Sequence, residues 1–164
     1  MNGAAVNAIP AQQKTGSELA GDPDTADAVQ VALGAEHAAV WCYGLIAAFL
    51  PAALEKWTRM DADAHRARRD TAVRLLTDAG RRPVAAEPAY RTPSPVTDQA
   101  TAVQLAQAAE HDSAAAWHSV LERCDDADLR RTALDGLTDA ATRGARWAAK
   151  AGTRPLVPPM PGET

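Results

Sequence analysis

Two glutamates, Glu36 and Glu110, lie in similar local sequences, each within an Ala-Glu-His triplet that leads into a tryptophan. Each falls in the middle of a stripe of apolar residues that has the spacing of a buried helix face. A carboxylate on such a face is costly unless a metal ion or a cationic side chain neutralises its charge. The sequence therefore predicts either a metal centre or a network of buried ion pairs at the middle of a helical bundle.

The positions of two arginines favour the ion pairs. The two glutamates are 74 residues apart, and Arg69 and Arg143 are separated by the same interval. Both arginines fall on the predicted inward faces of their helices, and a guanidinium group matches a carboxylate with two parallel hydrogen bonds. We therefore predict a buried polar network of Glu36, Arg69, Glu110 and Arg143, in which each half of the chain supplies one acid and one base.

The metal alternative can be compared with the ligand pattern of di-iron bundles. Those bundles take one glutamate from each of two helices and a Glu-x-x-His pair from each of the other two. Glu36 and Glu110 match the first pair, and Asp61 with His65 places a shorter acid and a histidine on one face of the next helix, but residues 126–152 contain no histidine. We expect no metal, no cofactor and no catalytic residue. A divergent metal-dependent oxidoreductase that uses Glu36, His65 and Glu110 stays open as the alternative.

Tryptophans suggest a second alternative. Each predicted helix carries one of them, and they are Trp41, Trp57, Trp117 and Trp147. Packing is their expected role, because they supply volume that alanine-rich helices lack. A pocket between tryptophan-bearing helices would instead make the protein a carrier of a small ligand.

Four helices are expected to position these side chains. Apolar periodicity, N-terminal caps and helix stops place them over residues 25–50, 52–79, 97–124 and 126–152. The caps are Asp24-Thr25, Thr97-Asp98 and Asp125-Asp126; Pro51 separates the first two helices, and Gly80 ends the second. We expect a flexible segment over residues 1–23, a bundle over 24–152 and a proline-rich tail over 153–164.

The segment between the second and third helices decides the connectivity. Residues 81–96 contain four prolines, which exclude a helix over most of the segment, and they are too many for a tight turn. They predict an extended crossover between two helix pairs. An all-α bundle of four helices with one such crossover has the connectivity of ferritin-like proteins.

Composition limits the partners and the location. The net charge of −4 leaves no basic face for nucleic acid. The apolar stretch 38–54 is short for a membrane span and contains glycine and proline, and no secretory signal precedes it, so we expect a cytoplasmic protein. Small-residue faces at Ala38-Ala39 and at residues 114–116 favour a homodimer, since they permit close helix approach. No protein or small-molecule partner can be identified from the residues.

Five segments together resemble an uncharacterised actinobacterial family of alanine-rich, ferritin-like domains, domain of unknown function 4439. The segments are residues 32–44, 65–80, 87–98, 105–121 and 133–152. The resemblance implies a ferritin-like four-helix bundle and no settled activity. Ferritin relatives oxidise iron or activate oxygen at a di-iron centre, but the last helix of this chain departs from that pattern because it lacks the ligands.

Overall fold

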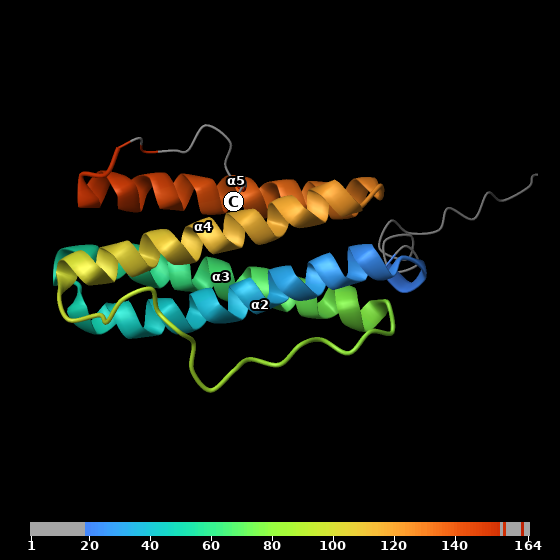
Figure 1. The fold of residues 1–164 in the computed structure, drawn as a ribbon, viewed down its shortest axis with the longest axis horizontal. Helices are drawn as coiled ribbons and strands as arrows, with labels where there is room; N and C mark the ends of the chain where they lie inside the picture. The colour runs from blue at the N-terminus through green and yellow to red at the C-terminus, as the bar shows by residue number, and fades with distance from the viewer. Residues whose placement is uncertain (1–18, 155, 157–161, 163–164) are drawn as a thin grey trace, which may run out of the picture.

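The computed structural model describes residues 19–154, 156 and 162. Within them the chain forms four long α-helices, which are α2 (Pro23–Ile46), α3 (Ala52–Asp78), α4 (Gln99–Arg123) and α5 (Ala127–Ala151). A short 3-10 helix, η1 (Ala47–Phe49), follows α2. Figure 1 shows α2 and α3 as one antiparallel pair and α4 and α5 as another, joined by an extended segment that returns along the bundle. The predicted all-α bundle of two helix pairs with a long crossover is confirmed.

The ends of the helices follow from capping side chains. Helix α2 begins at Pro23, earlier than predicted, because the Asp22 side chain accepts the Asp24 N–H and proline fits the first helical position. Asp98 and Thr101 form a capping box at the start of α4. Asp126 accepts two backbone N–H groups at the start of α5. The cap at Asp98 and the one at Asp126 lie where the sequence predicts them.

The crossover, residues 79–98, is fixed against the outer face of α2. The side-chain oxygen of Gln30 accepts the Val84 N–H at 2.8 Å, and the His37 ring lies 3.2 Å from the Val84 carbonyl oxygen. Farther along, the rings of Trp41 and Tyr90 are 5.9 Å apart. His37 thus helps to hold the crossover against α2.

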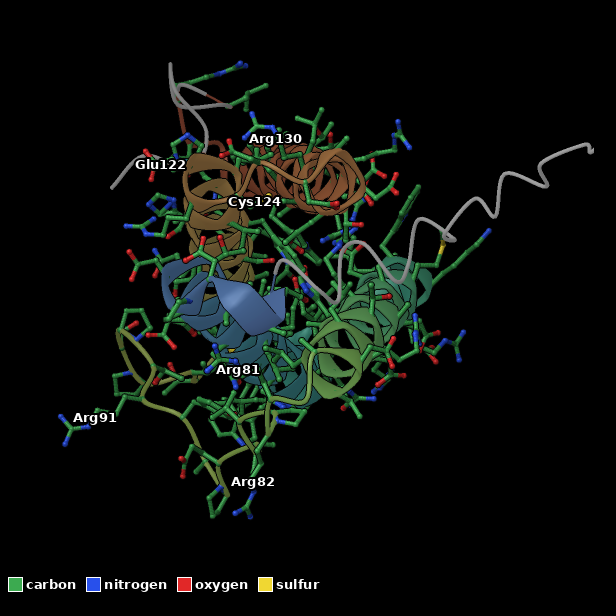
Figure 2. The ribbon with its side chains drawn as sticks, turned by 90° about the vertical axis from the view of Figure 1, so that its right-hand side faces the viewer. Arg81, Arg82, Arg91, Glu122, Cys124 and Arg130 are labelled. Atoms are coloured by element: carbon green, nitrogen blue, oxygen red, sulfur yellow. The ribbon has the colours of Figure 1, made fainter. Side chains whose placement is uncertain are left out.

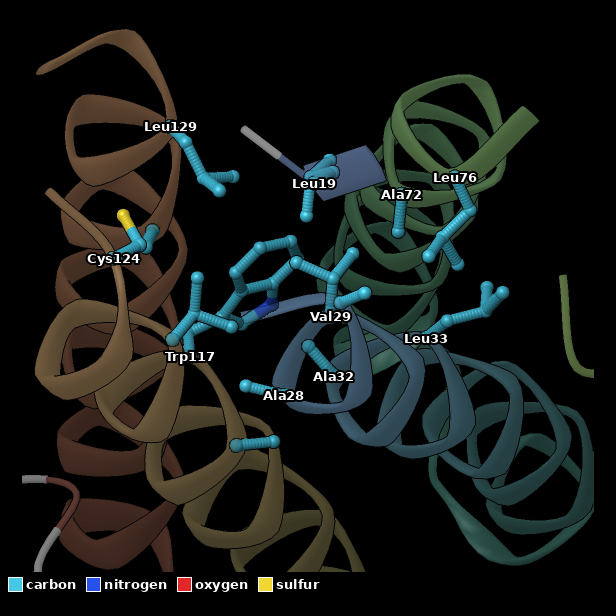
Figure 3. Packing of buried hydrophobic residues seen from close by; sticks show 14 of the residues in the cluster. Leu19, Ala28, Val29, Ala32, Leu33, Ala72, Leu76, Trp117, Cys124 and Leu129 are labelled. Atoms are coloured by element: carbon cyan, nitrogen blue, oxygen red, sulfur yellow. The ribbon is translucent and has the colours of Figure 1, made fainter. Parts of the chain in front are cut away.

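Two apolar clusters form the core. One cluster contains Leu19, Val29, Leu33, Leu76, Trp117 and Leu129 and is shown in Figure 3. The other contains Tyr43, Ile46, Leu54, Val103 and Trp147. Along their helices, Glu36, His65, Glu110 and Arg143 each fall between residues of the two clusters. Figure 2 shows side chains filling the space between the helices, while Arg82 and Arg91 of the crossover point outward.

The predicted domain limits are tested only in part by the described residues. Leu19 is fully buried in the first cluster, so at least this residue of the predicted flexible N-terminal segment packs into the core. Residues 1–18 lie outside the described residues. In the predicted tail, Thr153, Arg154, Leu156 and Gly162 are described, and Gly162 is buried.

Helix α2 is apolar, and its environment explains why. The span Pro23–Phe49 is long and apolar enough to cross a membrane by length and composition alone. In the folded chain it packs against α3 and α4 and places Glu36 in the interior. The same packing uses the alanines that favoured a dimer: Ala39, Ala114 and Ala116 are buried within one chain. Ala38 and Ala115 remain partly exposed, and the homodimer stays a prediction.

Gly136 of α5 should be intolerant of any side chain. A Cβ atom there would lie 2.7–2.9 Å from three ring atoms of Trp117. We expect Gly136→Ala to lower the free energy of unfolding by about 1–3 kcal/mol in urea denaturation, because the buried indole cannot move away freely. Gly34→Ala on α2 is the matched control: no atom lies within 4 Å of its Cβ position, so it should stabilise by about 0.5–1 kcal/mol. Equal effects of the two substitutions would contradict this packing.

Candidate functional site

The polar centre of the bundle takes one side chain from each long helix. These are Glu36 from α2, His65 from α3, Glu110 from α4 and Arg143 from α5. Their exposed fractions are 0%, 0%, 1% and 7%. Four ionisable groups are thus removed from water in one layer, and each of them depends on its neighbours to remain charged.

Glu36 is bonded through both of its oxygens. Its Oε1 accepts hydrogen bonds from Ser113 Oγ at 2.8 Å and from Trp117 Nε1 at 2.7 Å. Its Oε2 lies 2.6 Å from His65 Nδ1. Burial by itself raises the pKa of Glu36, but the bond and charge of His65 and the two other donors outweigh it and lower the pKa. Glu36 is therefore ionised in the interior.

Glu110 is bonded through both of its oxygens as well. Its Oε1 accepts from Tyr43 Oη at 2.6 Å and lies 3.2 Å from His65 Nε2. Arg143 Nε lies 3.0 Å from each carboxylate oxygen. Burial raises the pKa of Glu110, and the neighbouring His65 and Arg143 more than reverse this effect. The backbone of α5 also lies close to Glu110, since a Cβ atom at Gly144 would be 3.4 Å from Glu110 Cβ.

His65 is the bridge between the two acids. Both of its ring nitrogens face carboxylate oxygens, so both must carry a proton to donate, and the ring is then an imidazolium cation. Burial lowers the pKa of His65, but the two glutamates outweigh it and the pKa is raised. With two carboxylates, His65 and Arg143, the layer is electrically neutral. One nitrogen, Arg143 Nη2, is buried and has no partner among the described atoms.

Arg69 does not belong to this layer. Its Nε donates to the neighbouring Asp70 at 2.9 Å, and its side chain is 29% exposed. Arg69 lies one turn after His65 on α3, but its side chain turns away from the interior to pair with Asp70, and His65, Ala72 and Leu76 fill the buried face. The structure thus brings together Glu36, Glu110 and Arg143 of the predicted network, and His65 takes the place predicted for Arg69.

A second buried acid extends the network toward the surface. Asp61 of α3 is 3% exposed, and both of its oxygens accept from Arg146 Nη2. Trp147 Nε1 lies 3.1 Å from Asp61 Oδ2 and donates to Tyr43 Oη at 2.8 Å. Since Tyr43 in turn donates to Glu110, a chain of hydrogen bonds runs from the central layer to the partly exposed guanidinium of Arg146.

The donors to the two glutamates show a reciprocal spacing that sequence reasoning missed. Tyr43 lies seven residues after Glu36 and donates to Glu110, whereas Trp117 lies seven residues after Glu110 and donates to Glu36. In two antiparallel helices, side chains seven residues apart lie on one face, so each acid meets the donor of the opposite helix. The equal offset in the two local sequences was the available signal.

The residues at the centre do not fit a di-iron site. Both nitrogens of His65 serve as proton donors, which leaves no lone pair for a metal. Each oxygen of Glu36 and Glu110 already accepts a hydrogen bond, and the Arg143 guanidinium would repel a cation beside Glu110. Among the described residues, no group of three or more His, Cys, Asp or Glu side chains is arranged to hold a metal ion.

A double-mutant cycle tests which arginine neutralises the layer. We expect Glu110→Gln and Arg143→Met each to cost about 3–5 kcal/mol, because each leaves a buried charge without its partner. Their coupling energy in urea denaturation should be about 1–3 kcal/mol. Arg69→Met is the control on α3 and should cost no more than about 0.5 kcal/mol, with no coupling to Glu36→Gln. Strong coupling of Arg69 to Glu36 would overturn this arrangement.

The raised pKa of His65 predicts how stability depends on pH. A raised pKa means that the folded protein holds the proton of His65 more tightly than the unfolded chain does. The stability that His65 contributes is therefore complete below its usual pKa of 6.5 and is lost as pH rises through the folded-state pKa. The lowered pKa values of Glu36 and Glu110 act in the opposite sense. The stability that these glutamates contribute is present above about pH 4.5, their usual pKa, and is lost as pH falls through their folded-state pKa values. The free energy of unfolding should be highest between these limits.

Urea denaturation at several pH values measures the alkaline part of this dependence of stability on pH. From about pH 6 to about pH 9 the free energy of unfolding should fall in the native chain, and His65→Gln should flatten that slope. His111→Gln, an exposed histidine of α4, should retain the native slope. A stability that rises over this alkaline range would exclude an imidazolium at the centre.

Comparison with known proteins gives a family but no activity. None of the curated proteins matches the chain. The crystal structure of a conserved hypothetical protein, rv2844, from Mycobacterium tuberculosis is similar, with a TM-score of 0.76 and 32% sequence identity; the match covers 78% of this chain and 97% of that chain. A family model described as a domain of unknown function matches residues 28–164. The chain belongs to this family, domain of unknown function DUF4439.

Proposed function

We propose that this protein is a non-catalytic, metal-free bundle of the ferritin-like type, which serves as a structural or interaction module in the cytoplasm. A network of Glu36, His65, Glu110 and Arg143 lies where a di-iron protein would hold its metal. The observation that carries the proposal is the complete use of the two carboxylates: every oxygen accepts a bond from a side chain of another helix. The alternative of an oxidoreductase using Glu36, His65 and Glu110 would require these bonds to be broken.

The proposed role of the network is to fix how the four helices meet. An apolar layer would allow several helix rotations of similar energy, whereas each acid here accepts donors only in one arrangement. Glu36 joins α2 to α3 and α4, and Glu110 joins α4 to α2, α3 and α5. A bundle held in one arrangement presents a constant outer surface, which is what an interaction module requires.

Metal analysis of the purified protein distinguishes the module from the enzyme. Protein expressed with iron or manganese supplied, and purified without chelators, should contain far less than stoichiometric metal by elemental analysis, because its acids are occupied by protein donors. The Glu36→Gln, Glu110→Gln double variant provides the baseline for adventitious metal. Stoichiometric metal that is retained on dialysis and absent from the double variant would establish the oxidoreductase alternative instead.

A small-ligand carrier is the second candidate, and a pocket between two tryptophan-bearing helices favours it. The pocket measures about 230 Å³ and is lined by Leu54, Trp57, Arg146, Trp147 and Lys150. Another pocket, of about 280 Å³, lies between α4 and α5, where the α5 wall consists of alanine and glycine residues. The tryptophan pocket is the better candidate, since it combines aromatic surface with charged groups that can orient a ligand.

A further inference from the structure

The pocket lined by Trp57 lies where α3 and α5 face each other. Helix α2 packs closely against α3 and α4, and α4 against α5, whereas α3 and α5 are farther apart and meet through long side chains. Arg68 bridges to Asp139 and Arg146 bridges to Asp61 across this seam. A pocket remains between the helices because their backbones do not approach there.

One wall of the pocket is a flat aromatic surface. Trp57 is 43% exposed, whereas tryptophan side chains are on average highly buried in folded proteins. The guanidinium carbon of Arg146 lies 4.8 Å from the centre of its ring, so the indole already interacts with a cation. Trp147, buried beneath, and Leu54 complete an apolar floor. A planar ring of a ligand can pack against this surface.

The polar groups around the pocket are mainly positive. Within the described residues Asp61 accepts only from Nη2 of Arg146, so Nε and Nη1 remain as donors for a ligand. Lys150 in the last turn of α5 is exposed and makes no ion pair within the described part of the chain. Asp61 neutralises one of the two cations, which leaves an excess of one positive charge in a protein whose net charge is negative.

We propose that this pocket binds a small aromatic carboxylate. The ring packs on Trp57, and the carboxylate accepts hydrogen bonds from Lys150 and from the remaining donors of Arg146. This inference deepens the carrier candidate and rests on it: a carrier could use the same aromatic surface for a neutral ligand, whereas the charges of Arg146 and Lys150 select an anion. A ligand bound here would also contact Arg146, which connects through Asp61 to the central network.

Benzoate and benzamide provide a matched pair of probes, because they share one ring and differ in charge. Each is titrated into the full chain while the indole N–H signals are followed by nitrogen-15 NMR, with the Trp57 signal assigned from Trp57→Phe. We expect benzoate to shift the Trp57 signal with millimolar affinity or better and to bind at least about threefold more tightly than benzamide. Added salt should weaken benzoate binding only.

Three variants test the contacts. Lys150→Gln should weaken benzoate binding about two- to fivefold and leave benzamide unchanged. Trp57→Leu should weaken both ligands about tenfold, measured on the indole N–H signal of Trp147, which also lines the pocket. Lys56→Gln is the control, because this exposed lysine adjoins Trp57 in sequence but does not line the pocket. All three changes are at exposed positions, so folding can be verified by circular dichroism before each titration.

The outcomes separate this inference from the carrier candidate. Equal affinities for benzoate and benzamide, both lost in Trp57→Leu, would overturn the selection of anions while the carrier candidate stands. Shifts that persist in both Lys150→Gln and Trp57→Leu would place the binding elsewhere and overturn the assignment of this pocket. No shift with either probe would overturn both the inference and the carrier candidate, and would leave the proposal of a metal-free module untouched.

Discussion

The structure depends on one interaction, the imidazolium of His65 held between two buried carboxylates. Glu36 and Glu110 lie in the interior on neighbouring helices and would repel each other if nothing lay between them. His65 donates to both, and Arg143 supplies the second positive charge. The stabilisation is conditional, because removal of any member leaves a buried charge without its compensating partner. The layer therefore favours a single arrangement of the bundle more than it adds to its stability.

The helices that hold this layer follow the usual rules of apolar periodicity and capping, so the sequence predicts most of their buried faces and ends. On α4 and α5 the spacing of small and apolar residues predicts inward lines that include Glu110 and Arg143, and every residue of these lines is buried. The lines are Val103, Ala106, Glu110, Ser113, Trp117 and Val120 on α4, and Leu129, Ala133, Gly136, Ala140, Arg143 and Trp147 on α5. Here apolar periodicity is unambiguous, and Asp98 and Asp126 mark the starts of the helices. The crossover follows from its prolines, and its attachment through Val84 to Gln30 of α2 is a detail of packing that no pattern predicts.

Helix α3 shows why prediction of the site was incomplete. Its spacing places both His65 and Arg69, one turn apart, on the inward face. Packing buries His65, and the Arg69 side chain turns toward Asp70 instead. The hydrogen bonds of Tyr43 and Trp117 depend on how far α2 and α4 are shifted along each other, which follows from tertiary packing. The pairing of Asp61 with Arg146 joins residues 85 positions apart and is likewise beyond sequence periodicity.

The protonation state of His65 is the most direct test of this account. Nitrogen-15 NMR of the imidazole side chains, with His65 assigned from its substitution, reports whether each ring nitrogen carries a proton. At neutral pH the account predicts protons on both Nδ1 and Nε2 of His65, with deprotonation at a higher pH than that of an ordinary histidine. A neutral ring with one bare nitrogen at neutral pH would contradict it, since the two carboxylates would then share no cation.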